Sequence, residues 1–178
     1  MVPIETIDIL VNKENLLNGS YIPENLVYSD NNDNNFHKYV DPNKKPSVTK
    51  ETLEAFKKLQ AAALLDGLNI IIDSGYRSFD YQQQVWNHIL ETKGLEHTLK
   101  FVAPPGSSEH QTGLAVDIAR FINNQYNDDI TEECDEYKWM ITNSYKYGFI
   151  LRYPKDKKEI TGYEFEPWHF RYVGIALA

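Results

Sequence analysis

Residues 107–120 read SSEHQTGLAVDIAR, a stretch in which a polar turn passes into an apolar segment that carries one acidic residue. We expect a strand over 113–120, whose alternating leucine, valine and isoleucine share one face. Asp117 lies on the other face, between Ala115 and Ala119. A buried carboxylate must be paired, hydrogen-bonded or bound to a metal, because burying it alone costs free energy. The stretch by itself leaves two readings open: Asp117 binds a ligand in the room beside its small neighbours, or it accepts hydrogen bonds from a nearby turn.

Helices and short strands are expected on both sides of this stretch. The predicted helices, each ended by a glycine or followed by one, cover 49–66, 79–93 and 132–147. Their expected caps are Ser47 or Thr49, Ser78, and Thr131. The other predicted strands are 4–11, 68–72, 149–153 and 165–173, and the predicted loops are 29–47 and 95–109. Because no regular βαβ rhythm is present, the sequence predicts an α+β fold, and without a shift in composition we expect one domain over 1–178.

The composition narrows the class of protein. Acidic residues number 26 and basic residues 18, so the formal net charge is −8. This balance argues against binding to nucleic acid or to an anionic membrane, because both need clustered Lys and Arg. The lone Cys134 excludes an internal disulfide and any site built from several cysteines. No stretch resembles a signal peptide or a membrane span, so we expect a cytoplasmic protein if the chain is complete and a cell-envelope exterior location if a leader was removed.

A second cluster, residues 164–172, reads EFEPWHFRY. Glu166 and His169 are three residues apart, which in a flat strand would point them to opposite faces. Pro167 favours an extended polyproline-type geometry with roughly three residues per turn, which would bring both side chains to one side. Hydrolysis at a zinc ion needs such a pair, one ligand and one carboxylate that takes a proton from water. Taken alone, however, the cluster fits better with an exposed Glu166 and a His169 packed among aromatic residues.

Together the two clusters offer three metal ligands, His110, Asp117 and His169. Two imidazoles and one carboxylate leave one tetrahedral position for water, as hydrolytic zinc sites require. Glu166 would then act as the general base and afterwards as the acid toward the leaving amine. No HExxH helix is present, so the scaffold differs from that of the common zinc proteases.

Arg77 stands in a third cluster, residues 74–82, which reads SGYRSFDYQ. The cluster forms a predicted turn between a buried strand and a helix, from which a guanidinium can reach a cleft. There it would suit a substrate carboxylate or a developing oxyanion. The commoner alternative for a single arginine is a salt bridge, here to Asp73 or Asp80.

These motifs resemble the VanY-type D-alanyl-D-alanine carboxypeptidases and their VanXY relatives, zinc peptidases of bacterial cell-wall metabolism. The pattern S-x-H-x-x-G-x-A-x-D occurs at 108–117, E-x-x-H occurs at 166–169, and S-G-Y-R-S occurs at 74–78, followed by Gln82. The resemblance covers nearly the whole chain in the same order. It implies a central antiparallel sheet with flanking helices, shared with the Hedgehog signalling domain. It also implies a Zn²⁺ ion on the two histidines and the aspartate named above, with Glu166 as the catalytic base.

The same resemblance implies roles for residues around the metal. Arg77 would polarise the scissile carbonyl and stabilise the oxyanion, and Ser108 would bind the terminal carboxylate of the substrate. Gln82 and Trp168 would form walls of the pocket, and Ser78 is a further expected substrate contact. The remaining histidines match no motif position, and they are His37, His88 and His97.

We therefore expect a monomeric zinc D,D-carboxypeptidase that removes the C-terminal D-Ala from peptidoglycan stem peptides or their precursors. One alternative lies within the family: an L,D-carboxypeptidase, a D,D-dipeptidase or a phage-type endopeptidase, which would share the metal site and differ in the loops 29–47 and 95–107. The other alternative is a non-hydrolytic binding module with a structural zinc. Glu166 argues against it, since a structural site needs no base and usually has a fourth protein ligand.

Overall fold

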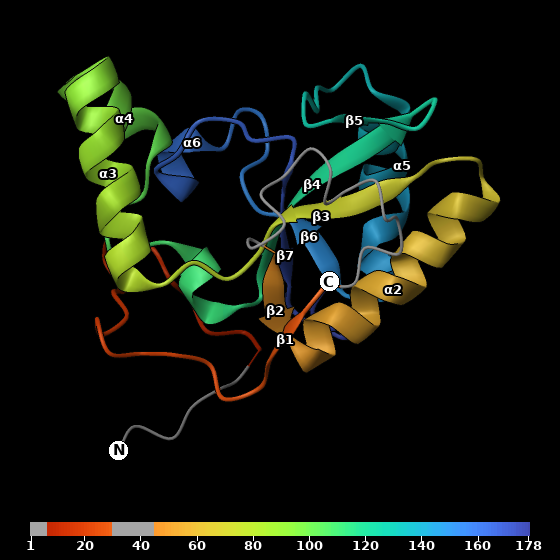
Figure 1. Cartoon of the computed structure of the whole chain (residues 1–178), viewed down its shortest axis with the longest axis horizontal. Helices are drawn as coiled ribbons and strands as arrows, with labels where there is room; N and C mark the ends of the chain where they lie inside the picture. Colours follow the sequence, from red (N-terminus) through yellow and green to blue (C-terminus); the bar gives the residue numbers. More distant parts are fainter. Residues whose placement is uncertain (1–6, 30–44) are drawn as a thin grey trace.

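The computed structural model describes residues 7–29 and 45–178. Its centre is an antiparallel sheet of five strands with the order β3-β4-β7-β6, in which β5 pairs with β4 (Figure 1). These strands are β3 (Ile70–Ser74), β4 (Ala115–Ile122), β5 (Gln125–Asn127), β6 (Phe149–Leu151) and β7 (His169–Tyr172). A separate antiparallel pair consists of β1 (Leu26–Tyr28) and β2 (Ser47–Thr49). Helices and an antiparallel sheet confirm the predicted α+β class.

Helices lie on both sides of the central sheet (Figure 1). The helices are α2 (Lys50–Leu65), α3 (Phe79–Lys93), α4 (Leu95–Phe101), α5 (Asp135–Asn143) and α6 (Lys158–Thr161), with 3₁₀ turns η1 (Glu109–Thr112) and η2 (Ser144–Tyr147). In Figure 1, α2 and α5 lie in the right half of the view, where α5 overlaps β3, and α3, α4 and α6 lie to the left. No helix among residues 7–29 and 45–178 is long and apolar enough to cross a bilayer.

The two faces of the sheet have different surroundings. Val116, Ile118 and Phe170 point to one face and form a core with Phe56 of α2 and Met140 of α5. Because side chains alternate along a strand, the residues between them point to the opposite face. That second face carries Asp117 and His169, which line one pocket with Val85 of α3 and Phe101 of α4.

The first two predicted helices are confirmed with their caps. Thr49 precedes α2, and its side chain accepts a hydrogen bond from the Thr52 backbone N–H. Ser78 precedes α3 and accepts from the Tyr81 N–H in the same way. Gly94 follows α3 with a φ of +81°, a conformation that glycine adopts at low cost.

The third predicted helix is shorter than expected. It begins at Asp135, so the predicted cap Thr131 is wrong, and Cys134 occupies the position before the first helical residue. The Thr131 N–H instead faces the Cys134 Sγ at 3.4 Å, which holds the chain in a turn before the helix. The final segment is the 3₁₀ turn η2, and Gly148 ends it in the left-handed conformation, as the sequence predicts.

Two predicted loops are only partly correct. Residues 95–109 contain α4 and the first residue of η1, although they were expected to be a loop. The helix was missed because it is short and follows directly after Gly94, and its buried Thr98 is held by a hydrogen bond from Oγ1 to the Gly94 carbonyl. Of the expected loop 29–47, residues 30–44 lie outside the described part, and Ser47 already belongs to β2.

The predicted strands at the two ends of the chain also change. Of the expected strand 4–11, residues 4–6 lie outside the described part, and 7–11 form a turn and coil. The strand expected over 165–173 is confined to β7, because a turn closed by the His169 N–H and the Glu166 carbonyl at 3.3 Å precedes it.

Gly75 allows a close approach that an alanine would block. A Cβ at this position would overlap the Ser47 carbonyl oxygen and lie 2.9 Å from Val48 Cγ1. We expect Gly75→Ala to lower the stability by about 1–3 kcal/mol, a typical cost of overpacking. A thermal melt measures this as a drop in Tm. Gly19→Ala is the matched control, because its Cβ would meet only the Phe79 ring at an ordinary 3.5 Å. Equal melting temperatures for the two variants would contradict this account.

Candidate active site

Three neighbouring strands position the centre of the site. Asp117 of β4 lies opposite Ser74 of β3 on one side and opposite His169 of β7 on the other. His110 comes from η1, the 3₁₀ turn that directly precedes β4. Gly113 ends this turn with a φ of +67°, which lets the chain reverse into the strand. The sheet register and this turn therefore bring together two segments that are about fifty residues apart in sequence.

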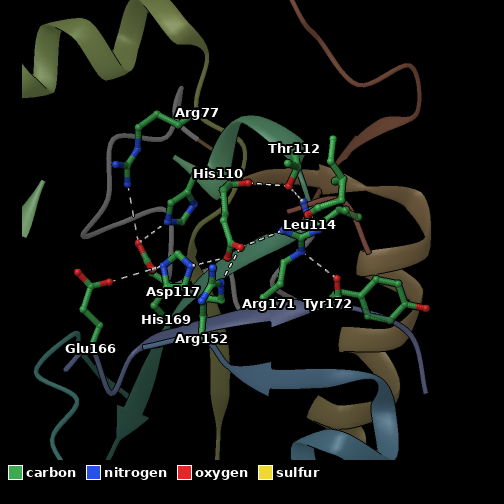
Figure 2. A network of polar contacts seen from close by, with 12 residues as sticks. Arg77, His110, Thr112, Leu114, Asp117, Arg152, Glu166, His169, Arg171 and Tyr172 are labelled. Carbon is green, nitrogen blue, oxygen red and sulfur yellow. Dashed lines mark hydrogen bonds and ion pairs between the residues drawn. The ribbon is translucent and has the colours of Figure 1, made fainter. Parts of the chain in front are cut away.

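The three predicted metal ligands do meet (Figure 2). His110 Nε2 is 3.2 Å from Asp117 Oδ2, and His169 Nδ1 is 3.0 Å from Asp117 Oδ1. One donor atom from each residue lies within 4.8 Å of the other two. His110 Nδ1 is 2.6 Å from the Gly75 carbonyl oxygen, which can only accept, so this nitrogen carries the proton and Nε2 is left for a metal. Two imidazole nitrogens and a carboxylate, all largely buried, fit a tetrahedral zinc ion with one open position.

The electrostatics of these residues favour an anionic Asp117. Burial raises the pKa of Asp117, but His110 and His169 together lower it by more than burial raises it. The pKa of Asp117 therefore lies well below its usual range. Burial lowers the pKa of His169, whereas its interactions with Asp117 and Glu109 raise it to about 10. Metal binding at His169 therefore has to displace a tightly held proton, which makes metal affinity dependent on pH.

Glu166 lies beside the ligands, with its Oε2 3.8 Å from His169 Nδ1. The Glu166 backbone N–H donates to the Tyr153 carbonyl at 3.1 Å, and the turn to His169 described above aims its side chain into the site. The prediction that both side chains share one side is correct, but its polyproline argument is wrong, because Pro167 occupies a turn. Burial raises the pKa of Glu166 to about 7, and the charge of Asp117 adds to this, while His169 and Arg77 oppose it.

Arg77 reaches the site from the turn between β3 and α3. Its Nη2 is 3.8 Å from Asp117 Oδ2 and 3.4 Å from Ser74 Oγ, and its Nη1 donates to Gln82 Oε1 at 3.0 Å. Within the described residues the ion pair of Arg77 is with Asp117, and neither alternative, Asp73 or Asp80, pairs with it; Asp73 instead accepts from the hydroxyl of Tyr126. The Arg77 backbone N–H donates to the His110 carbonyl at 3.1 Å, which ties this turn to η1.

These residues open into a pocket of about 270 Å³. Its walls include all three of the predicted ligands, together with Glu166, Arg77, Ser108, Gln82 and Trp168. Val85, Ile89 and Phe101, from α3 and α4, add an apolar side. Ser78 is absent from this lining and caps α3 instead, so its predicted contact with substrate has no support here.

Two of the other histidines lie away from this site. His88 and His97 are exposed on α3 and α4, as expected for residues outside the motifs. His37 lies outside the described residues.

The sequence analysis missed a buried polar cluster next to the ligands. Glu109 Oε1 accepts from Arg152 Nε at 2.7 Å and lies 3.2 Å from Arg171 Nη1. Glu109 occupies the unspecified position x of the S-x-H pattern, so the pattern did not indicate a role for it. Arg171 could have been found, because it is two residues after His169 and so shares its face of β7.

Comparison with known proteins identifies the family. Residues 45–175 match the sequence profile of the VanY family, described as D-alanyl-D-alanine carboxypeptidase. The match spans well over half of the chain, and the chain belongs to this family.

One curated relative and two solved structures illustrate the similarity. The putative carboxypeptidase YodJ of Bacillus subtilis (strain 168) is 42% identical over 98% of this chain, which spans 62% of YodJ. The structure of the LD-carboxypeptidase LdcB is 41% identical and superposes with a TM-score of 0.82, covering 96% of this chain and 78% of that one. A mutant of the D,D-pentapeptidase VanY, from a VanB-type resistance cassette and in complex with Zn(II), is 34% identical with a TM-score of 0.75, covering 96% and 89%. These neighbours confirm the predicted fold.

Loss of one ligand should abolish metal binding. We expect wild-type protein to carry about one zinc ion per chain and His110→Ala to carry almost none, because two remaining ligands hold zinc poorly. Elemental analysis of the purified proteins measures this, and a chelator should lower the Tm of wild type without affecting the variant. His88→Ala, at an exposed position of α3, is the control and should keep its zinc. Stoichiometric zinc in His110→Ala would show that the metal lies elsewhere.

Proposed function

We propose that this protein is a zinc carboxypeptidase that removes the C-terminal D-Ala from peptidoglycan stem peptides or precursors, with a D-Ala-D-Ala terminus as its main substrate. The observation that supports this most is the joint position of the His110–Asp117–His169 group, a largely buried Glu166 side chain and the Arg77 guanidinium in one pocket. We further propose that residues 1–178 act as one catalytic domain and as a monomer.

The zinc would be held by His110 Nε2, an Asp117 oxygen and His169 Nδ1. When bound, it supplies a Lewis acid that polarises the scissile carbonyl and makes water a better nucleophile. The zinc complex of the VanY structure, at 34% identity, supports this choice of metal.

Glu166 is suited to move the proton in this reaction. Its side chain is largely buried beside the ligands and has a pKa of about 7, close to the value at which a group both accepts and returns a proton. A bound cation would lower this pKa again, which keeps the group in its basic form before attack. Glu166 would take the proton of the attacking water and deliver it to the amine of the departing D-Ala.

Arg77 is placed to stabilise negative charge on the substrate. Its guanidinium lines the pocket, and its Nη1 is held by Gln82 Oε1. Gln82 Nε2 donates to the Ala103 carbonyl at 2.7 Å, so the oxygen and the nitrogen of the Gln82 amide are both hydrogen-bonded. We therefore assign Gln82 to the orientation of Arg77, Arg77 to the scissile carbonyl and its oxyanion, and the buried Ser108 to the terminal carboxylate.

A second candidate, L,D-carboxypeptidase activity, is favoured by the similarity to LdcB. That structure has a higher identity and TM-score than the D,D-pentapeptidase, 41% and 0.82 against 34% and 0.75. Both reactions release D-Ala and need the same metal group and base. They differ in the residue before the scissile bond, which the walls of the pocket must accept.

Mass spectrometry of the products tests the proposal directly. The purified protein is incubated with a stem pentapeptide ending in D-Ala-D-Ala, a tetrapeptide ending in one D-Ala, and free D-Ala-D-Ala, with and without a chelator. We expect the pentapeptide to lose one D-Ala, with loss of activity on chelation. Preferred cleavage of the tetrapeptide would establish the L,D activity instead, and cleavage of the free dipeptide would establish a dipeptidase. No release from any of the three would contradict the proposal.

Glu166→Gln separates catalysis from metal binding. The amide cannot take a proton, so we expect kcat to fall by about 10²–10⁴-fold while the zinc content stays at the wild-type level. Glu164→Gln is the control, because this nearby carboxylate pairs with Lys158 outside the ligand group. Turnover near the wild-type rate in Glu166→Gln would contradict the assignment of the base.

A further inference from the structure

Glu109 is a buried carboxylate with no role in the mechanism described so far. Its side chain is almost fully buried, with 2% exposed. One oxygen, Oε1, contacts Arg152 and Arg171 at the distances given above. The other oxygen, Oε2, is directed to His169 Nε2 at 3.6 Å. The carboxylate therefore joins two arginines to the side of His169 that faces away from Asp117.

The two facing atoms share an unusual property. Among the buried side-chain nitrogen and oxygen atoms of residues 7–29 and 45–178, only three make no hydrogen bond of normal length, and Glu109 Oε2 and His169 Nε2 are two of them. A buried polar atom without a partner costs about 1–3 kcal/mol, and a shift of a few tenths of an ångström would pair these two. A carboxylate oxygen held by arginines only accepts, so the proton of the pair belongs to His169 Nε2.

We propose that Glu109 is a positioning residue, which accepts the Nε2–H of His169 and so holds the ring with Nδ1 toward the metal. This inference rests on the proposed function only in requiring that a metal occupies the His110–Asp117–His169 group. With Nε2 protonated, Nδ1 has a free lone pair, as a ligand needs. The same ring edge faces Asp117 Oδ1 at 3.0 Å and Glu166 Oε2 at 3.8 Å.

The arginines keep Glu109 in place and ionised. Arg171 Nη2 donates to the carbonyls of Ile7 and Ile9 at 3.0 Å, which fixes the guanidinium against the N-terminal segment. Two guanidinium groups lie against Glu109 Oε1, Arg152 Nε at 2.7 Å and Arg171 Nη1 at 3.2 Å, and their positive charges favour the carboxylate form. Figure 2 shows Arg152 and Arg171 on the side of His169 opposite to Glu166. The arginines therefore leave the other carboxylate oxygen, Oε2, facing His169 Nε2 as an acceptor.

Each histidine ligand then has its second nitrogen bound. His110 Nδ1 donates to the Gly75 carbonyl, and His169 Nε2 donates to Glu109. A carboxylate behind a metal-binding imidazole fixes the tautomer and raises the basicity of the ligating nitrogen. Loss of such a partner typically weakens metal binding by about 10–100-fold.

Glu109→Gln tests this role with almost no change in shape. The arginines need an acceptor, so the amide oxygen must face them and the amide NH₂ must face His169 Nε2. Two donors cannot pair, and the favoured His169 tautomer then carries its proton on Nδ1, where it blocks the metal. We expect zinc affinity, measured by competition with a chelator of known affinity, to fall by about 10–100-fold.

Glu136→Gln is the matched control. Glu136 is also a buried carboxylate, 6% exposed, and it pairs with Arg120 at 2.9 Å. Glu136→Gln also removes an ion pair between a carboxylate and an arginine, but Glu136 does not contact the ligand group. We therefore expect the variant to bind zinc with wild-type affinity. Wild-type affinity in Glu109→Gln, or an equal loss in both variants, would overturn the inference.

Nitrogen-15 NMR of histidine-labelled wild-type protein with zinc tests the same point without a mutation, in case Glu109→Gln does not fold. We expect His169 to show a protonated Nε2 and a metal-bound Nδ1, and the reverse assignment would overturn the inference. This outcome is separate from the proposed function. Protein with the expected tautomer that releases no D-Ala would refute the function alone, whereas active protein with the reverse tautomer would refute the role of Glu109 alone.

Discussion

The site depends on one largely buried carboxylate in the middle of the sheet. Asp117 uses both of its oxygens, one for each histidine ligand, and a lone carboxylate in this position would be costly to bury. The cost is offset because β4 pairs with strands on both sides and brings His169 directly opposite. Because side chains alternate along β4, the two faces of the strand have different functions. Val116 and Ile118 anchor the hydrophobic core, while the residue between them carries the chemistry.

Local charge differs from the charge of the whole chain. The chain has a formal charge of −8, yet the carboxylates around the site are matched by arginines. The acids are Asp117, Glu109 and Glu166, and the bases are Arg77, Arg152 and Arg171, so the formal sum with neutral histidines is zero. A divalent cation would make this region positive. An acidic protein can therefore attract the carboxylate end of a peptide at short range, where screening by salt is weak.

The sequence predicted the parts of the site that depend on local pattern, and it failed where distant segments meet. The two-residue period placed Asp117 opposite to the core, and the caps and glycines located α2 and α3. The turn before His169 was misread, because a proline after Glu166 is compatible with both an extended segment and a turn. The contact between Glu109 and Arg152 spans 43 residues, so no pattern within one element could reveal it. The strand register and the folding of η1 against β7 are needed to bring these side chains together.

The 3₁₀ turn η1 links the two histidine ligands, because it contains His110 itself and the adjacent Glu109, which faces His169. His110 points into the pocket, and Glu109 reaches His169 from the other side. Adjacent side chains of a 3₁₀ turn diverge by about 120°, so one short turn can serve both histidines. Its backbone is held from outside by the Arg77 N–H, which donates to the His110 carbonyl, and from within by Thr112 Oγ1, which donates to the Glu109 carbonyl. A shift of η1 would therefore displace His110 and remove the acceptor that Glu109 offers to His169. This explains why all four residues of the turn are buried, although most connecting segments are exposed.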